Sequence, residues 1–108
     1  MASTMKRLLH LLAIACMFAP PLQAQRVLVS GKVMDAQTKE SLQGANVYLR
    51  KLNKGVVSDE RGNFQLSLSS SPKVEMNVSY VGYQTQKLHL NLTNDTVLTI
   101  KLIQDNRL

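Results

Sequence analysis

Few side chains in this sequence could form a catalytic or metal site. The 108 residues include two histidines, His10 and His89, and one cysteine, Cys16. A protein zinc site takes three or four ligands, mostly histidine and cysteine, and a serine nucleophile needs a histidine base held by a third group. His10 and Cys16 lie in an N-terminal segment that we expect to be removed. Because His89 would then stand alone on a strand, we expect no catalytic residue, no metal site and no cofactor, and hence no enzyme.

The first 24 residues have the layout of a secretory signal peptide. Lys6 and Arg7 precede an apolar run from Leu8 to Phe18, and a short exit ends at Ala24. The run is much shorter than the roughly 20 residues that cross a bilayer. We therefore expect a signal peptide at 1–24 and a mature domain at 25–108 without a transmembrane segment. Export without disulfides fits a bacterial periplasm or surface better than a small animal secretory domain.

The charges of the mature chain do not predict a nucleic-acid groove. Eleven basic residues stand against seven acidic ones after residue 24, which leaves a net charge of +4. Only Arg50, Lys51 and Lys54 cluster, around a predicted turn, and no aromatic residues lie between them. Nucleic-acid binding surfaces combine a basic stripe with aromatic stacking platforms. We therefore interpret this cluster as a solvated hairpin tip, with residues 53–55 as the turn itself.

One acidic turn could be mistaken for a calcium loop. In the segment DERGNF, Asp59 can accept hydrogen bonds from the backbone of its own turn, Gly62 can adopt positive φ, and Phe64 returns to the core. A calcium loop needs several more oxygen ligands at set intervals. The segment therefore predicts a hairpin turn.

The segment SYVGY, residues 79–83, could be either a ligand site or a corner of the fold. Tyr80 follows the inward register of Val78, so we expect its ring to pack. Gly82 fits a corner that needs positive φ or close backbone approach, and we expect the next strand from Tyr83 onward, with Tyr83 covering the end of the core. We interpret the segment as a signature of the fold.

The mature sequence alternates apolar and polar residues throughout. This period of two occurs at 27–33, 45–49, 64–68, 74–80, 88–92 and 98–102, with turn residues between the runs. Such alternation places one face of each strand in a core and the other in water. Several short strands of this kind in one small domain predict an all-β, two-sheet sandwich.

Nine residues carry a resemblance to a known family. Their order and spacing between Val29 and Leu102 resemble the carboxypeptidase regulatory-like domain: Gly31, Asp35, Gly44, Asp59, Gly62, Phe64, Tyr80, Gly82 and Tyr83. The resemblance implies a transthyretin-like, Greek-key β-sandwich of about seven strands, in which these are structural and not catalytic residues. Such domains commonly stand at the N-terminus of TonB-dependent outer-membrane receptors, so the resemblance implies an exported protein in the periplasm or outer membrane of a Gram-negative bacterium.

The resemblance leaves more than one function open. The leading hypothesis is an accessory domain of a TonB-dependent nutrient-uptake receptor, with the receptor or its energising machinery as protein partner. No TonB box, plug or barrel follows Leu102, so we expect either a free-standing domain or the leading piece of a longer receptor. The alternatives are a surface adhesion or carbohydrate-binding module, with Tyr48 as its one outward aromatic, and a spacer whose edge strands pair with a partner.

Overall fold

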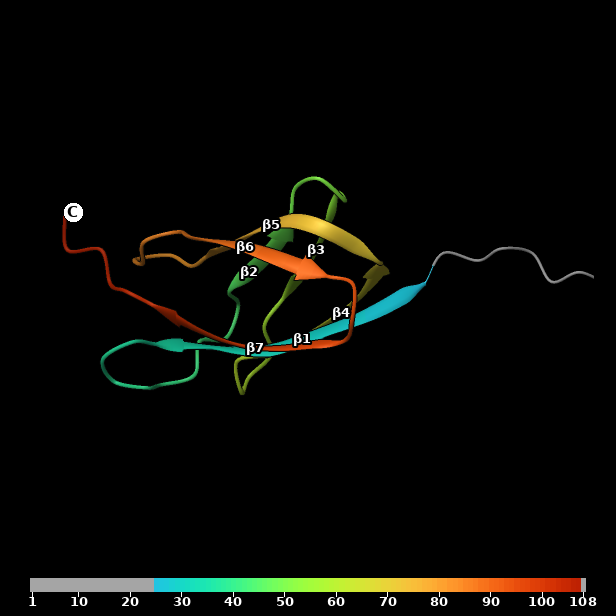
Figure 1. Cartoon of the computed structure of the whole chain (residues 1–108). Helices are drawn as coiled ribbons and strands as arrows, with labels where there is room; N and C mark the ends of the chain where they lie inside the picture. The colour runs from blue at the N-terminus through green and yellow to red at the C-terminus, as the bar shows by residue number, and fades with distance from the viewer. Residues whose placement is uncertain (1–24, 108) are drawn as a thin grey trace, which may run out of the picture.

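The computed structural model describes residues 25–107, which form seven strands and no helix (Figure 1). The strands are β1 (Arg26–Asp35), β2 (Asn46–Leu49), β3 (Lys54–Val57), β4 (Asn63–Ser69), β5 (Ser71–Ser79), β6 (Gln86–Leu92) and β7 (Thr96–Leu102). No helix in this described part of the chain is long and apolar enough to cross a membrane. The predicted signal peptide, with His10 and Cys16, lies outside the described residues.

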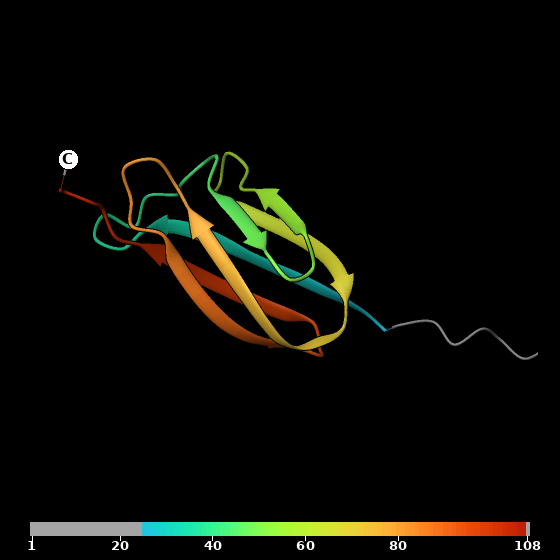
Figure 2. The same cartoon turned by 90° about the horizontal axis from the view of Figure 1, so that it is seen from above.

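The strands form two sheets that pack face to face (Figure 1, Figure 2). One sheet has the order β4-β1-β7 and the other has the order β3-β2-β5-β6. β1 is the central strand of the smaller sheet, antiparallel to β4 and parallel to β7, and the larger sheet is antiparallel throughout. The prediction of an all-β sandwich with seven strands is confirmed.

The core follows the predicted alternation. In β5, Val74, Met76 and Val78 are buried while the residues between them are partly exposed. The same period recurs in β1, β2 and β4, so each strand contributes one apolar face to the space between the sheets. The buried core consists of Val27, Val29, Val33, Leu42, Ala45, Val47, Leu49, Phe64, Leu68, Val74, Met76, Val78, Leu92, Ile100 and Leu102.

Gly31 and Phe64 are fitted to each other at the centre of the smaller sheet. They are register partners in the β1–β4 pair. A Cβ atom added at Gly31 would lie 2.3 Å from the carbonyl oxygen of Leu98 and 2.8 Å from Cζ of Phe64. The glycine therefore leaves the space in which the buried phenyl ring packs.

Two predicted boundaries are wrong. The turn between β2 and β3 occupies residues 50–53, and Gly55 lies within β3 opposite Tyr48. Asn53 takes the left-handed conformation there, with φ of 50°, a conformation that asparagine tolerates. β6 begins at Gln86 and not at Tyr83, because Tyr83 forms only an isolated bridge with Gln104 in the C-terminal segment.

Candidate functional site

Asp35 joins three segments at one end of the sandwich. It is the last residue of β1 and is 2% exposed. Its Oδ1 accepts hydrogen bonds from the backbone N–H groups of Gln37 (2.8 Å) and Thr38 (3.0 Å). Its Oδ2 accepts from the Tyr83 hydroxyl (2.6 Å) and from Nε2 of Gln104 (3.0 Å). The carboxylate thus fixes the loop after β1, the loop before β6 and the segment after β7.

These donors favour the charged form of Asp35. The Tyr83 hydroxyl has the largest effect, and together with the backbone N–H groups it holds the pKa of Asp35 well below its usual range, although burial opposes this. The same hydrogen bond raises the pKa of Tyr83 above its ordinary value. Both carboxylate oxygens of Asp35 are satisfied by groups of the protein itself, which is the arrangement of a structural anchor.

The SYVGY segment forms the corner that reaches Asp35. Tyr80 and Tyr83 pack edge to face, with ring centroids 5.4 Å apart and planes at 63°. The N–H of Tyr83 donates to the carbonyl of Tyr80 (3.0 Å), and Gly82 between them has φ of 84°. The Gly82 carbonyl accepts from the N–H of Asp105 (2.9 Å). Both rings are partly buried against the core, so the segment closes this end of the sandwich.

The remaining motif residues lie in neighbouring turns. Oδ1 of Asp59 accepts from the N–H groups of Arg61 (2.9 Å) and Asn63 (2.8 Å), and the N–H of Gly62 donates to the Asp59 carbonyl (2.9 Å). Gly44 also has positive φ, and a Cβ added there would lie 3.9 Å from the Tyr80 ring. The structure therefore gathers Asp35, Gly44, Tyr80, Gly82 and Tyr83 at one end.

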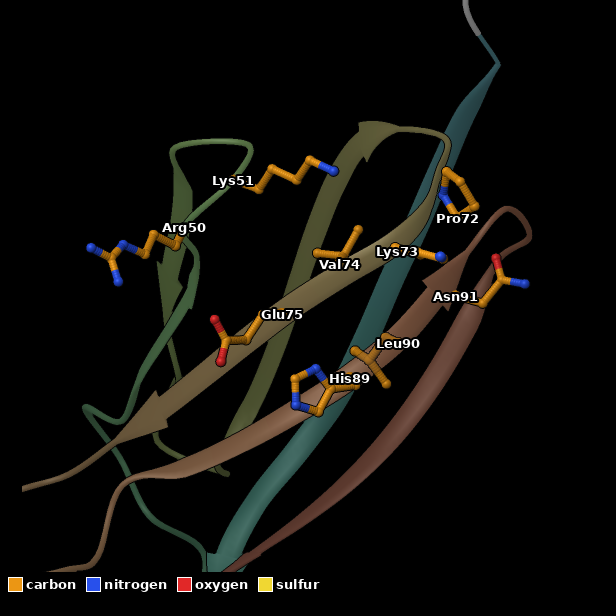
Figure 3. Close-up of a pocket in the computed structure, with 9 residues that line it drawn as sticks. All are labelled: Arg50, Lys51, Pro72, Lys73, Val74, Glu75, His89, Leu90 and Asn91. Atoms are coloured by element: carbon orange, nitrogen blue, oxygen red, sulfur yellow. The ribbon is translucent and has the colours of Figure 1, made fainter.

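A groove on the larger sheet lies toward the opposite end of the molecule, near the start of β5 (Figure 3). Its volume is about 640 Å³. It is named here the basic groove and is defined by Arg50, Lys51 and Lys73 with the apolar residues Pro72, Val74 and Leu90. Glu75, His89 and Asn91 also line it. His89 is exposed on β6, and within residues 25–107 no three His, Cys, Asp or Glu side chains gather closely enough to hold a metal ion.

The cations of the basic groove make no ion pairs with the residues described. The ion pair that the described chain does form joins Arg107 to Asp105, with Nε and Oδ1 3.1 Å apart. Glu75 is the one carboxylate among the groove residues, and it is the register partner of His89. The groove therefore combines three cations with one anion over an apolar floor.

Sequence reasoning did not find this groove. It identified Arg50 and Lys51 as neighbours at a turn, but Lys73 is distant from both in the chain. No sequence signal marks the groove, because it arises from the pairing of β2, which has four residues, with β5, which has nine. The longer strand must extend beyond the shorter one.

The chain is similar in sequence to part of a TonB-dependent receptor. The chain is 37% identical over 75 residues to the TonB-dependent receptor SusC of Bacteroides thetaiotaomicron. The match covers 69% of this chain and 7% of the receptor. This chain therefore corresponds to a small part of that relative.

Solved structures share the fold at low sequence identity. A chain of a type II cohesin–X–dockerin complex from Acetivibrio cellulolyticus matches with a TM-score of 0.61 and 19% identity, covering 72% of this chain and 58% of that one. Catechol 1,2-dioxygenase from an Acinetobacter species matches with a TM-score of 0.61 and 10% identity, covering 80% of this chain and 55% of the enzyme. At these identities the likeness concerns the fold alone.

The family assignment comes from the sequence pattern over most of the chain. Residues 29–108 match the family described as the CarboxypepD_reg-like domain. The matched range contains all seven strands except the first three residues of β1. It also contains both the Asp35 anchor and the basic groove. The chain belongs to the CarboxypepD_reg-like domain family.

Proposed function

We propose that this chain is a non-catalytic interaction domain that serves a TonB-dependent nutrient-uptake receptor in the periplasm or at the outer membrane. The observation that carries the proposal is the 37% identity to SusC over 75 residues. The domain would contact the receptor or the machinery that energises it, either as part of a longer receptor chain or as a separate protein.

The geometry supports a role in binding. Asp35 has a strongly perturbed pKa, which in a cleft can mark a functional site. Here its hydrogen bonds go to Gln37, Thr38, Tyr83 and Gln104 of the same chain, so the perturbation is explained by the fold. The basic groove is open to solvent, and its cations form no ion pair with any residue of 25–107, which suits recognition of another molecule.

Export is part of the proposal. We expect the signal peptide to be cleaved after Ala24, so that the mature chain begins at Gln25. Intact mass of the protein recovered from the periplasm or outer membrane tests this directly. A protein recovered there with residues 1–24 still attached would contradict the cleavage.

A surface adhesion or carbohydrate-binding module is the alternative. It depends on Tyr48, which lies on the outer face of β2 and is partly exposed. The Tyr48 hydroxyl donates to Oδ1 of Asn53 (2.9 Å), and among the described residues no Phe, Tyr or Trp lines the basic groove. Tight binding of a purified oligosaccharide that is lost in Tyr48→Ala would favour this alternative.

A domain exchange tests the receptor role. Residues 29–108 of this chain replace the matching segment of SusC, and nutrient uptake is compared with that of native SusC and of SusC lacking the segment. The same exchange carrying Gly31→Ala provides a control with a disrupted domain. We expect the exchanged receptor to transport better than both altered forms. Transport equal to that of the deletion, at equal amounts of receptor in the outer membrane, would contradict the proposal.

A further inference from the structure

The basic groove exists because β5 continues where β2 has stopped. β2 pairs with β5 only from Leu49 opposite Met76 to Asn46 opposite Ser79. The chain then turns away at residues 50–53, so residues 71–75 of β5 have no β2 neighbour. The β5–β6 pairing also shifts register between Ser71 and Val74. The result is an incomplete stretch of sheet bordered by the β2–β3 turn.

The groove has an apolar floor with lysines beside it. Its accessible apolar residues are Pro72, which is exposed at one end of the groove, and Leu90, which is partly exposed, whereas Val74 belongs to the buried core. Figure 3 shows the Lys51 side chain extending from the turn toward the first half of β5, from which Lys73 projects. The Arg50 guanidinium points away from the groove in that view. Lys51 and Lys73 are therefore the cations best placed to meet a ligand.

We propose that the basic groove binds an extended acidic segment of a partner protein. An apolar side chain of the segment would cover Pro72 and the exposed part of Leu90, and flanking carboxylates would pair with Lys51 and Lys73. Extended peptides commonly dock beside incomplete sheets, where pockets for side chains give specificity. The inference rests on the proposed function in taking the partner to be a protein.

The lining favours a peptide over other anions. A phosphate group would pair with the lysines but leave the apolar floor uncovered, and a sugar ring would lack an aromatic platform. Glu75 can accept an N–H from a peptide backbone, whereas a phosphate has no such donor when fully ionised. The site is thus suited to a ligand with carboxylates, N–H groups and an apolar side chain.

The distribution of charge supports an acidic partner. The groove end has the cations Arg26, Arg50, Lys51, Lys54 and Lys73 against the anions Glu75 and Asp95. The Asp35 end has the anions Asp35, Glu40, Asp59, Glu60 and Asp105 together with the cations Lys39, Arg61 and Arg107, so the groove end is the more basic of the two. Lys54 is held by a hydrogen bond from its Nζ to the carbonyl of Ser67 (3.1 Å). The separation would steer an acidic segment to the groove end, with an association rate that falls as salt is added.

Fluorescence anisotropy with the processed full chain tests the proposal. The probe is a labelled, end-blocked peptide of glutamates with one central leucine. We expect Lys51→Glu with Lys73→Glu to weaken its binding by roughly tenfold or more, because two attractive contacts become repulsive. The control, Lys32→Glu with Lys101→Glu, makes the same change in net charge on the other sheet, and we expect it to weaken binding less than about threefold.

The outcomes separate this proposal from its competitors. Absence of peptide binding, an equal loss in the control pair, or equal binding of a glutamate peptide without leucine would each overturn it. Groove-dependent binding of vesicles containing phosphatidylglycerol, without peptide binding, would assign the groove to a lipid surface instead. If the SusC exchange fails while the peptide still binds at the groove, the receptor role is wrong and the groove assignment stands. If the SusC exchange supports transport but the peptide does not bind at the groove, the groove assignment is wrong and the receptor role stands.

Discussion

The Tyr83 hydroxyl donates a hydrogen bond to Oδ2 of Asp35 across 2.6 Å, although 48 positions separate the two residues in the chain. This bond joins the SYVGY corner to the last residue of β1. Asp35 in turn holds the loop that follows it and the segment after β7 through Thr38 and Gln104. One buried carboxylate thus closes an end of the sandwich that has no disulfide among the described residues.

Tyr83→Phe tests the contribution of this bond. The variant keeps the ring and its packing against Tyr80 but removes the donor to Asp35. We expect Tm to fall by roughly 4–8 °C, the change typical of losing one such hydrogen bond in a domain of this size. Tyr80→Phe removes a hydroxyl that makes no hydrogen bond to Asp35, and should change Tm less. Equal shifts in calorimetry of the two variants would contradict the anchor.

Asp35 should make stability depend on acidity. Because folding depresses the pKa of Asp35, its contribution is fully present above its unfolded pKa of about 4 and is lost as the pH falls through the lower folded value. In urea denaturation, we expect wild type to exceed Asp35→Asn in stability at pH 7, and the difference to shrink steadily below about pH 4. Glu60→Gln, at an exposed carboxylate, is the control. A difference that stays constant down to pH 2 would show that the carboxylate charge is irrelevant.

Gly31→Ala tests the fit between the smaller sheet and Phe64. The added methyl group would meet the backbone oxygen of Leu98 at 2.3 Å, and backbone cannot move aside as a flexible side chain can. We expect a loss in the free energy of unfolding of about 3 kcal/mol or more, at the upper end for overpacking. Chemical denaturation measures this loss, and Gly31→Ala combined with Phe64→Leu should recover part of it. If the double variant recovers none of the lost stability, the added methyl group clashes mainly with the Leu98 carbonyl oxygen and not with the Phe64 ring.

Position 82 needs glycine because of its positive φ, and not because a side chain would lack space there. Its φ is 84°, but a Cβ atom added there would meet nothing within 4 Å. We therefore expect Gly82→Val to destabilise the domain by about 1–2 kcal/mol through backbone strain, and Gly82→Asn by less, since asparagine tolerates this region. Thermal melts of the two variants measure the difference. A melt of Gly82→Val that overlays wild type would refute the role of positive φ.

The strands could be predicted from the sequence because alternation reports burial directly. Val74, Met76 and Val78 predict an inward face, and all three are buried. The ends of the strands are harder to predict from the sequence, because they depend on contacts between segments that are distant in the chain. Tyr83 reads as the start of a strand, but its partners are Asp35 and Gln104, which the local sequence does not reveal.

The two ends of the molecule differ in how far the sequence predicts them. The Asp35 end consists of motif residues that the sequence identified one by one, although their hydrogen bonds to a single carboxylate required the structure. The basic groove depends on the pairing of β2 with β5, which brings Lys51 and Lys73 together. No local pattern records where a paired strand stops.

The most direct test of the proposed receptor role is to find the domain in cells of its source organism. An antibody against residues 25–107 is used on cytosolic, periplasmic and outer-membrane fractions, followed by cross-linking and mass spectrometry of the captured protein. We predict that the antigen lies in the periplasm or outer membrane and is joined to a TonB-dependent receptor, either as part of the same chain or through a cross-link. Antigen found in the cytosol, or released into the medium without any receptor, would contradict the proposed function.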